Sequence, residues 1–541
     1  MTFPKNGGRI DWVVRWISQT DESDGGPGYF RNAATPLGLI LIVVGTILRV
    51  RQYLFNRSLW MDEAFLSSNI VPRSYGALLE PLNDDQGAPI GFLLIEKLAT
   101  AAFGNSEYAL RLVPLLAGIA ALPLFYLAAR RIVGRTAALT GLGLLAFSRP
   151  GIYYSTEVKQ YSVDLAVTVL ILLLASWYRD RDEHAAEGSR IPVLAALAVA
   201  GACAVWLSHP AVFVLAGMGG TLLLWPRTGQ RPRFRLADPA LATVVAVWVA
   251  SFAANYYFFL RQLDTNRYLQ DYWQLAFPPL NAGLVSWLPR QFLAGFERPA
   301  GFALADVAAL IFLLGCVHLI RTSPRTLCLL ISPLAVCFAA SLLRKYPFGD
   351  RLLIFGIPLV LLVMGAGVFG RFWAARERLA PAVMLTALFL PVVGSAVLGI
   401  FRPVTREELR PVLDAVSAEV APGDVIYVYY GARPAFHFYT TVVGRLAFRD
   451  ATIVYGTNNR ARNHVLDRDG NWLRYQAEVN RLRGLRRVWL IVAHSYAGAG
   501  VHEDKMLLFF LDGMGRQLAR KSAPGASAYL YDLSTPTTTS R

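Results

Sequence analysis

Two adjacent carboxylates, Asp62 and Glu63, follow Trp60-Met61 directly after the first long apolar run of the chain. A carboxylate within hydrogen-bond reach of a hydroxyl can remove its proton as that hydroxyl attacks. The pair therefore indicates chemistry at a membrane surface, with Asp62 as the candidate general base. The alternative is that both acids only solvate a loop at the membrane edge, although charge at this depth is costly to keep there.

Two further segments contain fixed cations that could stabilise charge on a phosphate leaving group. The first is Glu157-Val158-Lys159-Gln160-Tyr161, where Lys159 is the candidate phosphate ligand and Glu157 could hold Lys159 or a substrate hydroxyl. The second is the segment 344–351, which contains Arg344, Lys345 and Arg351. Arginine binds phosphate in a bidentate manner. The alternatives are an interfacial salt bridge with aromatic anchors for the first segment and snorkelling side chains for the second.

These residues must be positioned by membrane helices. The 541 residues are 55% hydrophobic and 17% charged, and the mean hydropathy is +0.40, which excludes an ordinary soluble domain. About eleven apolar segments are long enough to cross a hydrocarbon layer of roughly 30 Å. They lie near residues 35–50, 113–129, 137–153, 162–177, 192–208, 211–225, 238–260, 303–320, 326–343, 352–370 and 380–400.

The net charge of +16 does not predict nucleic-acid binding, because the arginines are distributed by side of the membrane. Alternate short loops contain clusters such as Arg130, Arg131 and Arg179, as the positive-inside rule requires of cytoplasmic loops. We therefore predict a cytoplasmic N-terminus in a multi-pass inner membrane protein. The remaining loops, which contain Asp62 and Glu157, would then face the extracytoplasmic side together with the C-terminal region.

The composition changes near residue 402, where long apolar runs end and charge rises. Helical spacing over 407–420 and 505–518 alternates with strand-like segments at 424–430, 488–492 and 528–533. This pattern predicts an α/β domain whose strands are covered by helices on both faces. The predicted domains are therefore a polar tail (1–34), a transmembrane catalytic domain (35–401) and an extracytoplasmic α/β domain (402–541).

The order of features from Leu59 to Asp164 resembles a known family. An acidic pair outside the first span precedes a Pro-Ile-Gly-Phe-Leu-Leu segment at 89–94, and a Gly-Asn-Ser-Glu-Tyr segment at 104–108 leads into the second span. This order resembles the GT-C glycosyltransferases, in the branch of protein O-mannosyltransferases and lipid A aminoarabinose transferases. The family usually shows His-Pro-Pro where this chain has Ala88-Pro89-Ile90. The resemblance implies a polytopic fold with juxtamembrane helices in the first outside loop.

By this resemblance, the chain would move a sugar from a polyprenyl-phosphate carrier to a glycan, lipid or protein acceptor with inversion at the anomeric carbon. Glu63 would orient the acceptor or bind the sugar, and membrane lipids would surround the protein. A divalent metal is a possible cofactor, since Asp62, Glu157 and His209 could converge. These residues lack metal-ligand spacing, so no metal ligand is assigned.

Two other functions stay open at this point. A lipid-linked sugar transporter or flippase would be expected to place ionisable residues near the midplane of its spans and often to show repeated halves. This chain keeps nearly all its charge at the rims. A noncatalytic component of an envelope polysaccharide assembly system would be insensitive to substitution of Asp62.

Overall fold

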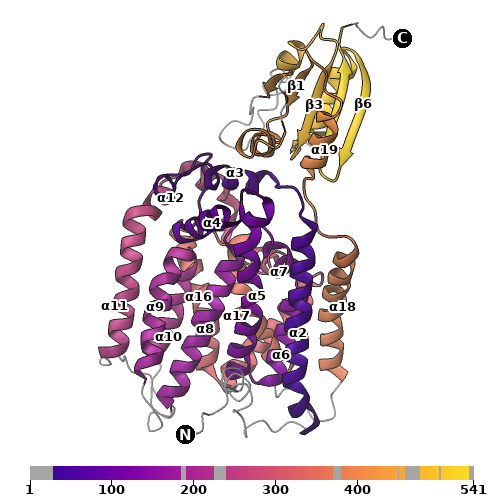
Figure 1. Ribbon diagram of the computed structural model, residues 1–541. Helices are drawn as coiled ribbons and strands as arrows, with labels where there is room; N and C mark the ends of the chain where they lie inside the picture. The colour runs from indigo at the N-terminus through magenta and orange to yellow at the C-terminus, as the bar shows by residue number, and fades with distance from the viewer. Residues whose placement is uncertain are drawn as a thin grey trace, which may run out of the picture.

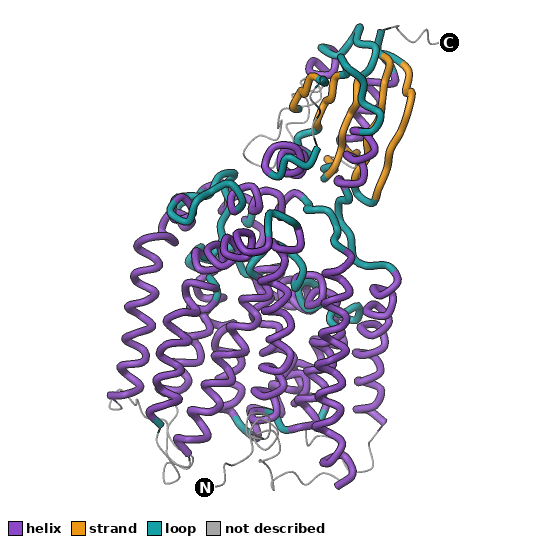
Figure 2. The backbone as a smooth tube through the Cα atoms, in the orientation of Figure 1, coloured by secondary structure: helices purple, strands orange, loops and turns teal. Residues whose placement is uncertain are grey.

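The computed structural model describes residues 28–183, 190–224, 239–369, 379–446, 448, 450–456, 476–498 and 501–534. Most of the predicted N-terminal tail, 1–34, lies outside the described residues. Figure 1 shows a bundle of upright helices with a smaller domain above one end of it. Figure 2 shows that this smaller domain contains the strands of the larger sheet.

Within the described residues, eight helices are long and apolar enough to cross a membrane, and three shorter apolar helices accompany them. The long ones are α2 (Gly28–Phe55), α5 (Glu107–Ile132), α8 (Tyr161–Glu183), α11 (Pro239–Asn255), α15 (Ala305–Thr322), α16 (Pro324–Leu342), α17 (Ile357–Val368, extended by the 3₁₀ segment Asp350–Gly356) and α18 (Leu379–Phe401). The shorter ones are α6 (Arg135–Phe147), α9 (Ile191–Leu207) and α10 (Ala211–Leu224). Each apolar segment expected from the sequence overlaps one of these helices, but the segment expected at 137–153 is divided, because α6 ends at Phe147 and a separate short helix follows at Arg149–Tyr154. The polytopic helical fold class is confirmed.

Close helix contacts fix the segment that contains Arg351. A Cβ atom at Gly315 of α15 would lie 1.9 Å from the carbonyl oxygen of Val363 in α17, so only glycine fits there. Small residues let membrane helices approach this closely. The contact therefore holds α17 against α15. Arg351 lies in the 3₁₀ segment Asp350–Gly356, which leads directly into α17.

Short helices cover the end of the bundle that faces the smaller domain (Figure 1). They include α3 (Met61–Ile70), α4 (Ile90–Phe103) and α12 (Arg261–Asp264). The other short helices are α7 (Arg149–Tyr154), α13 (Arg267–Tyr272) and α14 (Leu284–Glu297). Asp62 and Glu63 lie in the first turn of α3, where their negative charge is favourable at the positive end of the helix dipole. The juxtamembrane helix expected after Pro89 is α4.

The C-terminal domain is built on a five-stranded sheet in the order β2-β1-β3-β7-β6. Its strands are β1 (Val425–Val428), β2 (Thr452–Tyr455), β3 (Val488–Ala493), β6 (Arg516–Ala523) and β7 (Ala526–Asp532), and a separate pair is formed by β4 (Ala497–Gly498) and β5 (Val501–His502). Strand β1 is parallel to β2 and β3, whereas β7 and β6 are antiparallel to their neighbours. The sheet is therefore mixed rather than wholly parallel.

Helices cover both faces of this sheet. Trp489 and Leu530 pack in the cluster that contains α19 (Leu409–Ser417) and α20 (Arg433–His437), while Tyr531 packs with α22 (Glu503–Asp512) on the other face. The helix expected at 505–518 ends six residues early, because Gly513 and Gly515 interrupt it and residues 516–518 begin β6. Strand β6 was missed because its exposed edge position leaves no buried apolar run.

Candidate active site

Asp62 forms an ion pair with Arg351. The distance between Arg351 Nη2 and Asp62 Oδ2 is 2.7 Å, and the two side chains are only 13% and 15% exposed. Burial by itself would raise the pKa of Asp62, but nearby cations, of which Arg351 contributes most, outweigh it and lower that pKa from its ordinary value. Asp62 is therefore an ionised carboxylate that keeps some access to solvent.

Lys159 belongs to the same cluster, since its charge also lowers the pKa of Asp62. Its ammonium donates a hydrogen bond to Gln86 Oε1 at 2.9 Å, and its side chain is buried. Burial lowers the pKa of Lys159, and the negative charges of Asp62 and Glu157 offset part of that effect. Arg351 and Lys159 both lie near the carboxylate of Asp62, so two positive charges share one negative charge. An anionic ligand here would supply a further counter-charge.

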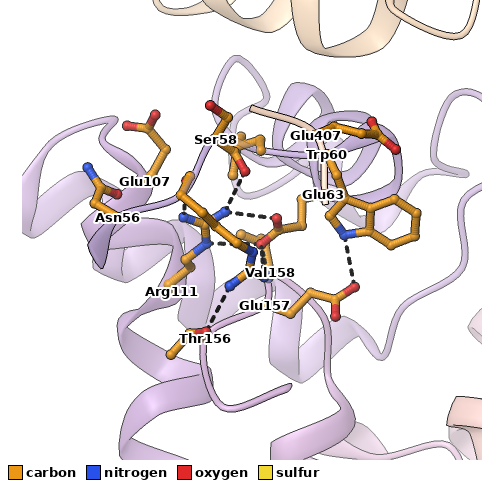
Figure 3. Close-up of polar contacts among 12 residues, drawn as sticks. Asn56, Ser58, Trp60, Glu63, Glu107, Arg111, Thr156, Glu157, Val158 and Glu407 are labelled. Carbon is orange, nitrogen blue, oxygen red and sulfur yellow. Dashed lines mark hydrogen bonds and ion pairs between the residues drawn. The ribbon is translucent and has the colours of Figure 1, made fainter. Parts of the chain in front are cut away.

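Glu157 and Tyr161, from the same segment as Lys159, also lie at this site. Glu157 Oε1 accepts a hydrogen bond from Trp60 Nε1 at 3.1 Å (Figure 3), and within the described chain its buried Oε2 has no hydrogen-bond partner. Burial, followed by the charge of Glu63, raises the pKa of Glu157. The ring of Tyr161 is buried in edge contact with Tyr154 at 5.2 Å between centroids. Lys159 is held by Gln86 and not by the carboxylate of Glu157.

Glu63 is enclosed by the protein itself. Its carboxylate binds Arg111 through Nε at 3.0 Å and Nη2 at 2.8 Å, binds Arg57 at 3.4 Å and accepts the Val158 amide at 2.9 Å (Figure 3). Burial alone would raise the pKa of Glu63, but Arg111 and then Arg57 lower it. The side chain is fully buried. These contacts connect α3, α5 and the loop before α8, so Glu63 ties the two sequence motifs together.

Arg344 and Lys345, which the sequence offered as phosphate ligands, do not lie in this cluster. Arg344 and Lys345 are both exposed, and Lys345 binds Asp264 at 2.6 Å. The guanidinium of Arg344 lies 5.8 Å from the ring centroid of Phe277. Of the segment 344–351, only Arg351 lies beside Asp62.

Arg406 is a member of the site that the sequence reasoning missed. It lies in the connection to the C-terminal domain, and its guanidinium is 4.0 Å from the ring centroid of Trp60 and 5.2 Å from that of Tyr153. Its charge also lowers the pKa of Asp62. The side chain is exposed, and no described residue forms a hydrogen bond or ion pair with its guanidinium. Arg406 is separated from Asp62 by 344 positions of sequence and belongs to no motif, so nothing in the sequence links it to the site.

No metal centre is evident among the residues that the structure describes, since no three or more His, Cys, Asp or Glu side chains are grouped to hold an ion. His209 lies half-buried in the turn between α9 and α10. Among the described residues, it is not grouped with Asp62 and Glu157 as a metal ligand.

The comparisons with known proteins bear directly on this site. Residues 87–258 match the family model described as dolichyl-phosphate-mannose-protein mannosyltransferase. The chain is also similar to ArnT from Cupriavidus metallidurans in the apo state, at 12% identity and a TM-score of 0.52, over 93% of this chain and 99% of that one. Residues 87–258 thus resemble this mannosyltransferase family, and the chain shares the fold of ArnT. The resemblance expected from the sequence is thereby confirmed for residues 87–258 by the family model and for the fold by ArnT.

Further similar structures are those of ArnT from Cupriavidus metallidurans bound to undecaprenyl phosphate and of the oligosaccharyltransferase AglB from Archaeoglobus fulgidus in complex with an inhibitory peptide and a dolichol-phosphate. The first has 11% identity and a TM-score of 0.49 over 93% of this chain and 98% of that one. The second has 13% identity and a TM-score of 0.46 over 93% and 74%. No curated protein matches the sequence.

The glycosyltransferase segment 87–258 contains Glu157, Lys159 and Tyr161 but neither Asp62 nor Arg351. The fold brings all of these residues into one cluster, because Asp62 follows α2 and Arg351 precedes α17 at the same end of the bundle. The candidate site thus extends well beyond the segment that matches the family model.

Proposed function

We propose that the protein transfers a sugar from a polyprenyl-phosphate-linked donor to a hydroxyl of a glycan, lipid or protein acceptor at the extracytoplasmic face of the membrane. The observation that carries this proposal is the Asp62–Arg351 pair, with Lys159 beside it, at the end of a GT-C helical bundle. One carboxylate and several cations in one place suit a reaction that needs a base for the nucleophile and positive charge for a phosphate.

Asp62 acts as the base in this proposal. Its carboxylate takes the proton of the acceptor hydroxyl while the hydroxyl oxygen forms a bond to the anomeric carbon. The bond from that carbon to the phosphate oxygen breaks, and the polyprenyl phosphate leaves with the electron pair. The acceptor attacks from the face opposite the phosphate, so the configuration at the anomeric carbon is inverted.

Arg351, Lys159 and Arg406 bind the donor phosphate. The leaving phosphate gains charge as the bond to the sugar breaks, and fixed cations in a partly buried site stabilise that charge. Among the described residues, Arg351 Nε is buried without a hydrogen-bond partner, and Arg406 is exposed without an ion pair. Both guanidinium groups therefore retain hydrogen-bond donors for phosphate oxygens.

The donor would also activate the base. In the free protein Arg351 lies against Asp62 and makes it a weak base. When a phosphate shares Arg351, the added negative charge raises the pKa of Asp62. A carboxylate with a pKa closer to the working pH is the better proton acceptor. Donor binding thus precedes efficient attack by the acceptor.

Glu63 serves as a positioning residue and not as a sugar ligand in this proposal. Its bonds to Arg111, Arg57 and the Val158 amide leave it no exposed surface for a substrate. Arg344 and Lys345 are likewise omitted, since they lie away from Asp62. Glu157, through its unpartnered oxygen, and Tyr161, behind Tyr154, are proposed to line the donor-sugar side.

The test is transfer of labelled sugar from polyprenyl-phosphate donors by the purified protein, wild type against Asp62→Asn. Asp84→Asn is the matched control, since Asp84 is exposed in the loop before α4. We expect loss of turnover only in Asp62→Asn, with a cooperative thermal transition showing that both variants are folded. Turnover that survives Asp62→Asn would remove Asp62 as base, and a wild type inactive with every donor would favour the transporter or noncatalytic function.

A further inference from the structure

The loop before α3 depends on the C-terminal domain for its backbone hydrogen bonds. Three of its amides, those of Ser58, Leu59 and Met61, donate to side chains that come from residues beyond 406. Ser58 binds Glu408 Oε2 at 3.0 Å, Leu59 binds the hydroxyl of Tyr439 at 2.8 Å and Met61 binds Glu407 Oε2 at 3.2 Å. We call these three partners, Glu407, Glu408 and Tyr439, the clamp.

From this arrangement we propose that the clamp makes the C-terminal domain a positioning element for Asp62. The inference rests on the proposed function in taking Asp62 as the base. It goes beyond that function because it assigns the C-terminal domain a part in catalysis without contact with substrate.

The loop cannot satisfy these amides itself. Residues 56–60 are not helical, and the first amides of α3 have no partner within the helix. Trp60, the residue before α3, makes no side-chain cap hydrogen bond, so a carboxylate from another domain takes the place of an N-cap. A buried amide without a partner costs free energy, and the clamp removes that cost at three positions.

Two of the clamp residues, Tyr439 and Glu407, are themselves held in place. Tyr439 donates its hydroxyl to Glu107 Oε1 at 3.1 Å, and Glu107 pairs with Arg410. Glu407 Oε1 lies 2.5 Å from His494 Nδ1 at the end of β3. The clamp therefore joins the amino end of α5, the connection at 404–410 and the central sheet strand to the loop that leads into Asp62. Figure 3 shows Glu407 beside Trp60, on the side of the loop away from Glu63.

The geometry of the reaction gives these bonds their importance. Asp62 follows Met61 directly, so any shift of the Met61 amide moves the base relative to the acceptor and the phosphate. A misplacement of about 1 Å can cost about 100-fold in rate. Positioning acts on the chemical step, whereas Arg351 and Lys159, which come from other segments of the chain, still supply positive charge for the donor.

Kinetics of three full-length variants test the proposal. Tyr439→Phe, Glu407→Ala and Glu408→Ala each remove the acceptor of one loop amide, with Tyr531→Phe and Glu419→Ala as matched controls. Tyr531 donates its hydroxyl to Asp512 on the far face of the sheet, and the exposed Glu419 pairs with Lys521. We expect kcat to fall about 10- to 100-fold in the clamp variants, with the KM for donor changed less than about twofold. The controls should match the wild type.

Conservative substitutions separate positioning from general damage. Glu407→Gln and Glu408→Gln retain an oxygen that accepts the loop amide, so they should recover at least part of the kcat lost in the alanine variants. Glutamine variants as slow as alanine variants, or equal loss in the controls, would overturn the proposal. So would clamp variants with wild-type kcat.

Amide hydrogen exchange gives a readout that needs no turnover. In the wild type, a peptide covering residues 58–61 should exchange slowly, because three of its amides are hydrogen-bonded and buried. Exchange in this peptide should accelerate at least about tenfold in each clamp variant and not in the controls. Unchanged exchange in the clamp variants would overturn the proposed role of the clamp, even if the enzyme is active. Faster exchange in a protein without transferase activity would support the clamp and overturn only the proposed function.

Discussion

The guanidinium of Arg351 lies 2.7 Å from the carboxylate of Asp62, although 289 positions of sequence separate the two residues. This pair joins the two chemical requirements of glycosyl transfer from a phosphate, a base and a cation, in one contact. It also means that removal of Arg351 would raise the pKa of Asp62.

The acid limb of the pH profile should respond to Arg351. Ionised Asp62 is required, so activity falls as the pH drops through its pKa, which Arg351 and its neighbours hold below the ordinary aspartate value. Arg351→Gln removes the main cation and should move the acid limb of kcat/KM to higher pH. In the wild type, the limb of kcat should lie at higher pH than that of kcat/KM, because bound phosphate shares Arg351. Coincident limbs in both proteins would contradict this assignment.

Substitution of Lys159 should weaken the donor far more than substitution of Lys345. Lys159 lies in the Asp62 cluster, whereas Lys345 is exposed and bound to Asp264. A lost hydrogen bond to a charged group costs roughly 1.5–3 kcal/mol, so Lys159→Met should lower kcat/KM for the donor about 10- to 100-fold. Lys345→Met should stay within about twofold. Donor titration measures kcat/KM for both variants. A larger loss in Lys345→Met than in Lys159→Met would place the phosphate at Arg344 and Lys345.

Arg406 can be compared with Arg402 in the same connection to the C-terminal domain. Both side chains are exposed, but only Arg406 stacks on Trp60 next to Asp62. Arg406→Ala should raise the KM for the polyprenyl-phosphate donor about tenfold, since one charge-assisted contact is lost. Arg402→Ala should leave the KM unchanged. Equal behaviour of the two variants would exclude Arg406 from the phosphate site.

Glu63→Gln should lower the free energy of unfolding and have little effect on the KM for the donor. The substitution leaves Arg111 and Arg57 buried without their counter-charge, and breaking a buried ion pair in this way costs about 3–5 kcal/mol. Asp180→Asn disturbs the more exposed pair with Arg131 and should cost less than about 1 kcal/mol. Thermal unfolding in detergent measures both. A stable Glu63→Gln protein with a raised donor KM would instead make Glu63 a sugar ligand.

Local sequence determined much of this protein. Apolar runs long enough to span a membrane specify helices wherever they occur, and charges at their ends mark the rims, so the helical bundle and the candidates Asp62, Glu157 and Lys159 could be predicted from the sequence. The buried strands β1 and β3 could be predicted for the same reason, because continuous β-branched and aromatic runs report burial on both faces.

Tertiary structure alone decided which of these residues meet. Glu63 and Asp62 are adjacent in sequence, yet the helical rotation between them turns Glu63 toward Arg111 and Asp62 toward Arg351. Arg406, Glu407 and Tyr439 reach the same loop only because the C-terminal domain packs over α3 (Figure 1). Such contacts between distant segments depend on the summed packing of the whole chain, and no local pattern encodes them.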